Sequence, residues 1–237
     1  MSDAVRAHIG QAAWSLVRRA ESWRAGGGRT PARPLLAPGP LFRVPAGAGG
    51  GNVPCRVVLT VDDGPDPRWT PRLLDVLDAH DVRATFFVVG ERAARHPELL
   101  RRIVGAGHTL GNHSYSHPQP FAARTAEEIH EEIRRTQHVV AQETGRTPVH
   151  FRAPAGGWSR AVLDAARDQG LTPVDWSVDP KDWRSPPVPR IVRTVSKARH
   201  GDIVLCHDGG GERSRTVAAL DVALGLLRRR GVAVTPL

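Results

Sequence analysis

The sequence predicts an α/β domain with a parallel sheet and helices packed outside it, and two observations carry this prediction. From residue 53 onward, short apolar runs alternate with amphipathic stretches. Most of the runs are almost continuously apolar, as strands buried on both faces are. Seven such runs fit either an open doubly wound sheet or a short barrel.

The predicted strands are seven short runs over residues 56–61, 84–89, 108–113, 149–153, 172–178, 202–207 and 232–235. The predicted helices lie between them, over residues 70–80, 91–105, 125–143, 159–169, 188–199 and 213–229. In sheets of this kind the chemistry takes place at the carboxyl ends of the strands. Polar residues at those ends are therefore the candidates for a functional site.

The segment before residue 53 has a different composition. Apolar residues within 1–24 recur at helical spacing, which predicts an amphipathic helix that docks on the main domain or, alternatively, lies on a membrane surface. Residues 25–52 are rich in Gly, Pro and Ala and predict a linker or a wrapped arm. The chain thus divides into 1–24, 25–52 and a catalytic domain over 53–237.

The hydrophobic segments also bear on location. The longest apolar stretch near the start covers only about residues 12–17 and is followed by charges, so no secretory signal is expected. No run approaches 18 apolar residues, so no transmembrane helix is expected. The sequence as written predicts a cytoplasmic protein, and a different start codon would make it extracytoplasmic.

The formal charge of +9 invites a nucleic-acid or membrane-surface interpretation. Residues 1–52 hold seven arginines against two acidic residues, and the rest of the chain is close to balanced. Only Lys181 and Lys197 are lysines, which is typical of an arginine-rich coding bias. We therefore expect no nucleic-acid partner; the sequence leaves the oligomeric state open, with a monomer as the expectation.

The two cysteines are predicted to be free thiols. Cys206 directly precedes a strand end, whereas Cys55 lies seven residues before the end of its own strand, about 23 Å away at ~3.3 Å per residue. A disulfide needs Cα atoms within about 7 Å, so the two cannot pair.

Two adjacent carboxylates end the first predicted strand, in the stretch TVDDGPDP (60–67). A single aspartate could simply cap a turn, but two like charges side by side are costlier and less often structural. Asp62 and Asp63 can divide the labour of a reaction, because one carboxylate can bind a metal while the other takes a proton.

Two histidines follow the third strand, in the stretch HSYSH (113–117). A four-residue spacing puts two side chains on one side of a helical turn, although a polar turn would also explain them. Together with one aspartate, His113 and His117 make a three-ligand set that leaves a position for water, as in catalytic zinc sites.

Three further strand ends carry polar residues: Arg152 in FRAPAGGWS, an aspartate-rich loop in DWSVDPKDW (175–183), and His207 in VLCHDGGG. Each alone has a structural explanation, as a surface ion pair, a loop or a packed histidine. Because they follow successive strands of one sheet, they are expected to lie near the predicted metal site. Arg152 would supply a cation there, and His207 a proton donor.

In this order, the motifs TVDDGP, HSYSH, RAPAG, DPKDW and VLCHD closely resemble those of the polysaccharide deacetylases, the NodB-homology domain of carbohydrate esterase family 4. The resemblance covers about residues 55–237. It implies a distorted (β/α)7 barrel, in agreement with the seven predicted strands.

The resemblance also implies roles for individual residues. Asp62 matches the general base of the family, and Asp63, His113 and His117 match its metal ligands. Arg152 matches the arginine that holds the base carboxylate.

The remaining roles concern the acid and the acetyl pocket. Asp179 matches the aspartate that orients the catalytic histidine, which is His207. Trp183 and Leu205 match residues that line the acetyl pocket, and the backbone N–H of Ala155 matches an oxyanion donor.

Two positions depart from the family pattern. Val61 replaces the usual aromatic of the first motif, which we interpret as a packing change. Ala155 replaces an aromatic that frequently follows the proline of the third motif, so a sugar-contacting ring is missing while the N–H donor remains. The departure at Ala155 affects the expected substrate preference.

The predicted function is metal-dependent removal of N-acetyl groups from N-acetylglucosamine-containing glycans, of chitooligosaccharide or peptidoglycan type. Zinc is the expected metal, with cobalt or manganese as substitutes. An Asp/His/His set could also hold iron. The sequence is also compatible with O-deacetylation of acetylated xylan, with hydrolysis of a small amide, or with a non-catalytic carbohydrate- or polyanion-binding module that uses the basic segment 1–52.

Overall fold

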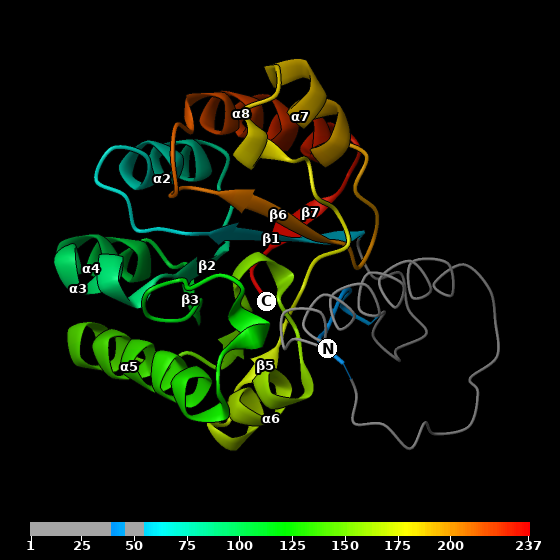
Figure 1. Cartoon of the computed structure of the whole chain (residues 1–237). Coiled ribbons are helices and arrows are strands. Elements are labelled where there is room, and N and C mark those ends of the chain that lie inside the picture. The colour runs from blue at the N-terminus through cyan, green and yellow to red at the C-terminus, as the bar shows by residue number, and fades with distance from the viewer. Residues whose placement is uncertain (1–38, 46–54) are drawn as a thin grey trace, which may run out of the picture.

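The computed structural model describes residues 39–45 and 55–237. The predicted helix within 1–24 and most of the predicted arm over 25–52 lie outside the described residues. The rest forms a curled sheet with helices arranged around its outer side, and the carboxyl end of the chain returns to the sheet (Figure 1). Within the described part of the chain, no helix is long and apolar enough to cross a membrane.

All seven predicted strands are confirmed in position. They are β1 (Arg56–Asp62), β2 (Thr85–Val88), β3 (Thr109–Asn112), β4 (His150–Phe151), β5 (Thr172–Pro173), β6 (Ile203–His207) and β7 (Ala233–Thr235). The order is β5-β4-β3-β2-β1-β6, and every pair is parallel. Because parallel strands end at the same edge, all five sequence motifs come together there.

The barrel is distorted in two ways. β7 pairs with the first half of β1, over Arg56–Val58, and so does not extend the sheet beyond β6. β5 covers two residues instead of the predicted 172–178. Beyond it the chain forms only isolated bridges, between Val174 and Leu41 and between Val178 and Val204.

The helices are α2 (Thr70–Ala79), α3 (Gly90–Arg95), α4 (Pro97–Gly105), α5 (Ala126–Thr144), α6 (Arg160–Asp168), α7 (Val188–Val195) and α8 (Ser214–Arg229). Short 3₁₀ turns are η1 (Phe121–Ala123), η2 (Pro154–Gly156) and η3 (Asp182–Arg184). The prediction of one helix over 91–105 is wrong. Pro97 lacks a backbone N–H, and His96 before it has φ −132°, so the chain breaks and α4 begins at the proline.

β1, which ends at the site, is deeply buried. Six of its seven residues are buried. Val57, Leu59 and Val61 pack into a large cluster with apolar side chains of the surrounding helices, among them Leu73 of α2 and Leu220 of α8. Burying a side chain of this size contributes about 1.5–3 kcal/mol. The site at the end of β1 is thus built on a strand fixed from both faces.

Residues 39–45 are the described part of the predicted arm, and they lie beside the strands at the two ends of the sheet. The N–H of Leu41 donates to the carbonyl of Pro173 in β5 at 2.8 Å. The Arg43 guanidinium pairs with Asp202, just before β6, at 2.9 Å. This short segment therefore helps to join the two edges of the curled sheet.

The prediction about the cysteines is confirmed. Cys55 and Cys206 are both free, and Cys206 is fully buried in the core. Burial, followed by the charges of Asp182, Asp179 and Asp62, raises the pKa of the Cys206 thiol well above its ordinary value.

Candidate active site

One carboxylate and two imidazoles meet at the carboxyl edge of the sheet. Asp63 follows β1, and His113 and His117 follow β3. The Nε2 atoms of His113 and His117 lie 3.4 Å and 3.3 Å from Asp63 Oδ1. The three residues have ligand atoms within 4.8 Å of one another, which is the chemistry and spacing of a divalent metal site.

The orientation of His113 fits metal binding. Its Nδ1 lies 2.7 Å from the backbone carbonyl of Arg152, which accepts a hydrogen bond from that nitrogen. The proton on Nδ1 leaves the lone pair on Nε2, the atom that faces Asp63. A carbonyl behind a histidine ligand is the usual way in which proteins fix its tautomer.

The loop that carries the two histidines is not the helical turn that their spacing suggested. Ser114 and His117 both have positive φ, at 64° and 54°, so neither residue has the conformation of a right-handed helix. Glu132 of α5 holds this loop. Its Oε2 accepts from the N–H groups of Tyr115 and Ser116 at 2.8 Å, and its Oε1 accepts from the Ser116 hydroxyl at 2.8 Å.

The surroundings lower the pKa values of Asp63 and His117, which favours the deprotonated forms that bind a metal. Burial would raise the pKa of Asp63, but the hydrogen bond and charge of His113, with the charges of His207 and His117, hold it well below its usual range. Burial, followed by the charge of His113, lowers the pKa of His117 to about 4. Near neutral pH the carboxylate is therefore ionised and His117 has a free lone pair.

A buried arginine binds the carboxylate of Asp62. Arg152 Nη1 donates to Asp62 Oδ1 at 2.7 Å and to the Thr60 hydroxyl at 2.8 Å. Arg152 Nη2 donates to the carbonyl of Asp175, and its guanidinium lies 4.2 Å from the Phe87 ring centre. Only one oxygen of Asp62 is used by Arg152, so the other remains available to accept a proton.

His207 ends β6 beside Asp62, since the two are register partners on neighbouring strands. Its Nδ1 lies 2.8 Å from Asp182 Oδ1, and its backbone N–H donates to Asp182 Oδ2 at 2.9 Å. Burial alone would lower the pKa of His207, but the hydrogen bond and charge of Asp182, with the charges of Asp63 and Asp62, raise it to about 9. His207 is therefore protonated near neutral pH.

The expectation that Asp179 orients His207 is wrong. Asp179 accepts instead from the backbone N–H and the ammonium of Lys181, at 2.8 Å and 2.6 Å. Lys181 has φ 59°, which reverses the chain and turns Asp182, the first residue of η3, toward β6. Asp182 is buried and also accepts from the Thr216 hydroxyl of α8 at 3.0 Å.

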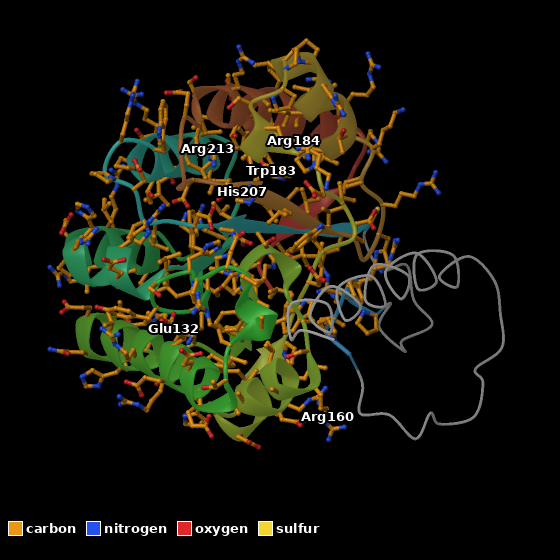
Figure 2. All side chains as sticks on the ribbon, viewed as in Figure 1. Glu132, Arg160, Trp183, Arg184, His207 and Arg213 are labelled. Carbon is orange, nitrogen blue, oxygen red and sulfur yellow. The ribbon has the colours of Figure 1, made fainter. Side chains whose placement is uncertain are left out.

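A cleft of about 470 Å³ opens over these residues. The predicted pocket residues Ala155, Trp183 and Leu205 line it together with Asp62, Asp63, His113, His117 and His207. Trp183 is 44% exposed and lies near His207 (Figure 2), so its ring is available to a ligand. Ala155 has φ 53°, an uncommon conformation for a residue with a Cβ that often marks a functional loop.

The fold and the site together are those of a hydrolase with a candidate metal site. A potential metal cluster, a held carboxylate and a protonated imidazole converge on one cleft at the carboxyl edge of a parallel barrel. The sequence profile of the polysaccharide deacetylase family matches residues 50–174. The chain belongs to that family.

Individual relatives agree over most of the chain. A chitooligosaccharide deacetylase of Bradyrhizobium sp. (strain ANU 289) is 44% identical, over 84% of this chain and 96% of the relative. A peptidoglycan-N-acetylglucosamine deacetylase of Bacillus cereus is 40% identical, over 74% of this chain and 83% of the relative. The structure of a family 4 carbohydrate esterase from Streptomyces lividans in complex with acetate superposes with a TM-score of 0.72, at 36% identity and 76% coverage of this chain and 91% of that one.

Proposed function

We propose that this protein hydrolyses the N-acetyl groups of N-acetylglucosamine-containing glycans and releases acetate. The observation that carries the proposal is that a proton acceptor and a proton donor lie on adjacent strands, each held by a residue of opposite charge. Asp62 is an acceptor held by Arg152, and His207 is a donor held by Asp182 on the adjacent strand. A module that only bound carbohydrate would need neither group.

The residues divide the reaction as follows. Asp62 takes a proton from the attacking water, since its second carboxylate oxygen faces the metal cluster at 3.7 Å from His113 Nε2. The backbone N–H of Ala155 stabilises the oxygen on which negative charge develops. His207 gives its proton to the amine that leaves, which would otherwise depart as a poor leaving group.

Asp63, His113 and His117 would hold one divalent cation, and we propose zinc, with cobalt or manganese as substitutes. One carboxylate and two imidazoles are ligands that zinc favours in catalytic sites. When bound, the ion would polarise the acetamide carbonyl and lower the pKa of a water molecule in the site.

The substrate assignment to N-acetylated glycans follows from the two named relatives, which act on chitooligosaccharide and on peptidoglycan. The test is acetate release by the zinc-loaded protein from three substrates: chitooligosaccharides, peptidoglycan fragments and acetylxylan. We expect release from one or both of the N-acetylated glycans. Release from acetylxylan alone would replace the proposal by O-deacetylation, and release from none of the three would contradict it.

A further inference from the structure

Arg213 is a buried cation of the cleft to which neither the motifs nor the proposed reaction gives a role. It lies between the VLCHDGGG loop and α8 (Ser214–Arg229), and only 3% of its surface is exposed. It lines the same cleft as His207 and Trp183, and the three are labelled close to one another in Figure 2.

The hydrogen bonds of Arg213 leave one of its nitrogens without a partner. Nε donates to the carbonyl of Gly209 at 2.8 Å, and Nη1 donates to the carbonyl of Glu212 at 3.1 Å. Both acceptors are neutral. Nη2 makes no hydrogen bond to any described residue, and within that part of the chain no carboxylate lies within 4.0 Å of the guanidinium.

A buried charge of this kind is unusual, because buried ions are normally paired with an opposite charge. The carboxylate closest in sequence is directed elsewhere: Glu212 accepts from the N–H of Ser214 at 2.9 Å and faces Arg68 at 3.7 Å. Other cations of the site do have anionic partners, as Arg152 pairs with Asp62 and Lys181 pairs with Asp179. Arg213 is held in place by its own loop, but its charge is not balanced by a contacting carboxylate.

The free nitrogen lies next to the metal carboxylate. A Cβ added to Gly210 would lie 2.8 Å from Asp63 Oδ2 and 3.5 Å from Arg213 Nη2, so a single carbon-sized position is within reach of both groups. Gly210 has φ +74°, a conformation that glycine adopts without strain. A group that contacts Nη2 would therefore belong to the reacting sugar or to a sugar directly linked to it.

We propose that Arg213 binds a carboxylate substituent of the glycan substrate and makes the enzyme favour acidic N-acetylated glycans over neutral ones. This proposal rests on the proposed function and adds the substrate class. An arginine is suited to this task because its planar donors match the two oxygens of a carboxylate, and a charged hydrogen bond is stronger than a neutral one.

The test compares three oligosaccharides of equal length with the zinc-loaded enzyme. One is a neutral N-acetylglucosamine oligomer. The second is a peptide-free peptidoglycan strand, in which alternate sugars carry an ether-linked carboxylate, and the third is the same strand with its carboxylates reduced to alcohols. We expect the wild-type KM to be lowest for the carboxylate strand and to rise by about tenfold or more on reduction.

Two variants isolate the residue. Arg213→Gln should raise KM for the carboxylate strand by about 10- to 100-fold while changing KM for the two uncharged glycans less than about twofold. Arg213→Lys keeps the charge and should raise KM for the carboxylate strand less than Arg213→Gln does. Arg215→Gln is the matched control, because Arg215 is exposed and only two residues away; it should leave all three values unchanged.

Several results would overturn the proposal. One is a wild-type enzyme with equal KM for the carboxylate strand and its reduced form, a measurement that does not depend on any variant folding. Another is an Arg213→Gln variant that loses activity equally on all three glycans, or that changes only inhibition by free acetate. Absence of acetate release from every glycan by the wild type would instead contradict the proposed deacetylation itself.

Discussion

Two histidines in one cleft, His117 and His207, have opposite electrostatic surroundings. His117 is partly buried beside another imidazole, and its pKa is lowered to about 4. His207 is buried against Asp182, and its pKa is raised to about 9. Near neutral pH the same side chain is thus neutral in one place, as a metal ligand must be, and protonated in the other, as a proton donor must be.

The difference teaches that burial alone does not set the role of a histidine. Burial lowers the pKa of both residues, and the neighbours then decide the outcome. At His117 the nearby His113 adds to the effect of burial. At His207 a buried carboxylate, itself held by Thr216, reverses that effect. Substitutions on either side of the cleft can therefore separate the two roles.

The largest effect is expected at the metal side. His117→Ala removes one of three ligands, and we expect loss of stoichiometric zinc and loss of activity on every substrate, with the fold retained. Elemental analysis after dialysis and circular dichroism are the measurements. Full zinc content in this variant would contradict the assignment of the cluster.

Asp62→Asn should separate metal binding from proton transfer. The amide is nearly isosteric but cannot accept the proton of the attacking water, so we expect zinc to remain bound while kcat falls by about 10²–10⁴-fold. Parallel zinc and acetate-release assays test this. An active Asp62→Asn variant would eliminate Asp62 as the base.

Asp182→Asn should lower the pKa of His207 and so make this histidine more like His117. The Asp182 charge opposes the effect of burial, so without it the pKa of His207 falls from about 9 and the proton is lost at lower pH. The alkaline limb of the pH profile of kcat/KM should therefore shift to lower pH.

Asp179→Asn is the matched control for that experiment. Asp179 pairs with Lys181 rather than with His207, so the alkaline limb should stay in place. A shift in the Asp179 variant with none in the Asp182 variant would reverse the assignment made from the structure.

Glu132→Ala should produce the smallest effect, because Glu132 positions the His117 loop without being a ligand. Loss of supporting contacts of this kind typically weakens metal affinity about 10- to 100-fold, so chelator competition should show a weaker site and excess zinc should restore activity. Glu131→Ala, which removes only an exposed pair with Arg134, should change neither. Equal zinc affinity in both variants would argue against the positioning role.

Much of this arrangement could be predicted from the sequence, because it depends on local signals. The apolar runs located all seven strands, and the rule that parallel strands end at one edge brought Asp62, Asp63, His113 and His117 together. Pro97 is a local signal too, but it lies inside an otherwise helical pattern, so the pattern predicts one helix where the structure has two.

The remaining features depend on contacts between distant segments. DPKDW holds two aspartates, and only the left-handed turn at Lys181 decides that Asp182 faces His207. Glu132 looks like an ordinary surface residue of α5 until the fold brings it against the histidine loop. Arg213 carried no signal either, since its burial is set by the Gly209–Gly211 loop around it.

The central claim, that the two histidines do different work, is tested most directly by His207→Ala on two substrates. Acetate release is measured with an N-acetylated oligosaccharide and with an activated aryl acetate, alongside His117→Ala. The amine of the oligosaccharide leaves poorly without a proton, whereas an aryl oxide leaves unaided. We predict a large loss on the oligosaccharide and a much smaller one on the aryl ester for His207→Ala, and large losses on both for His117→Ala. Equal losses on the two substrates for His207→Ala would contradict the account.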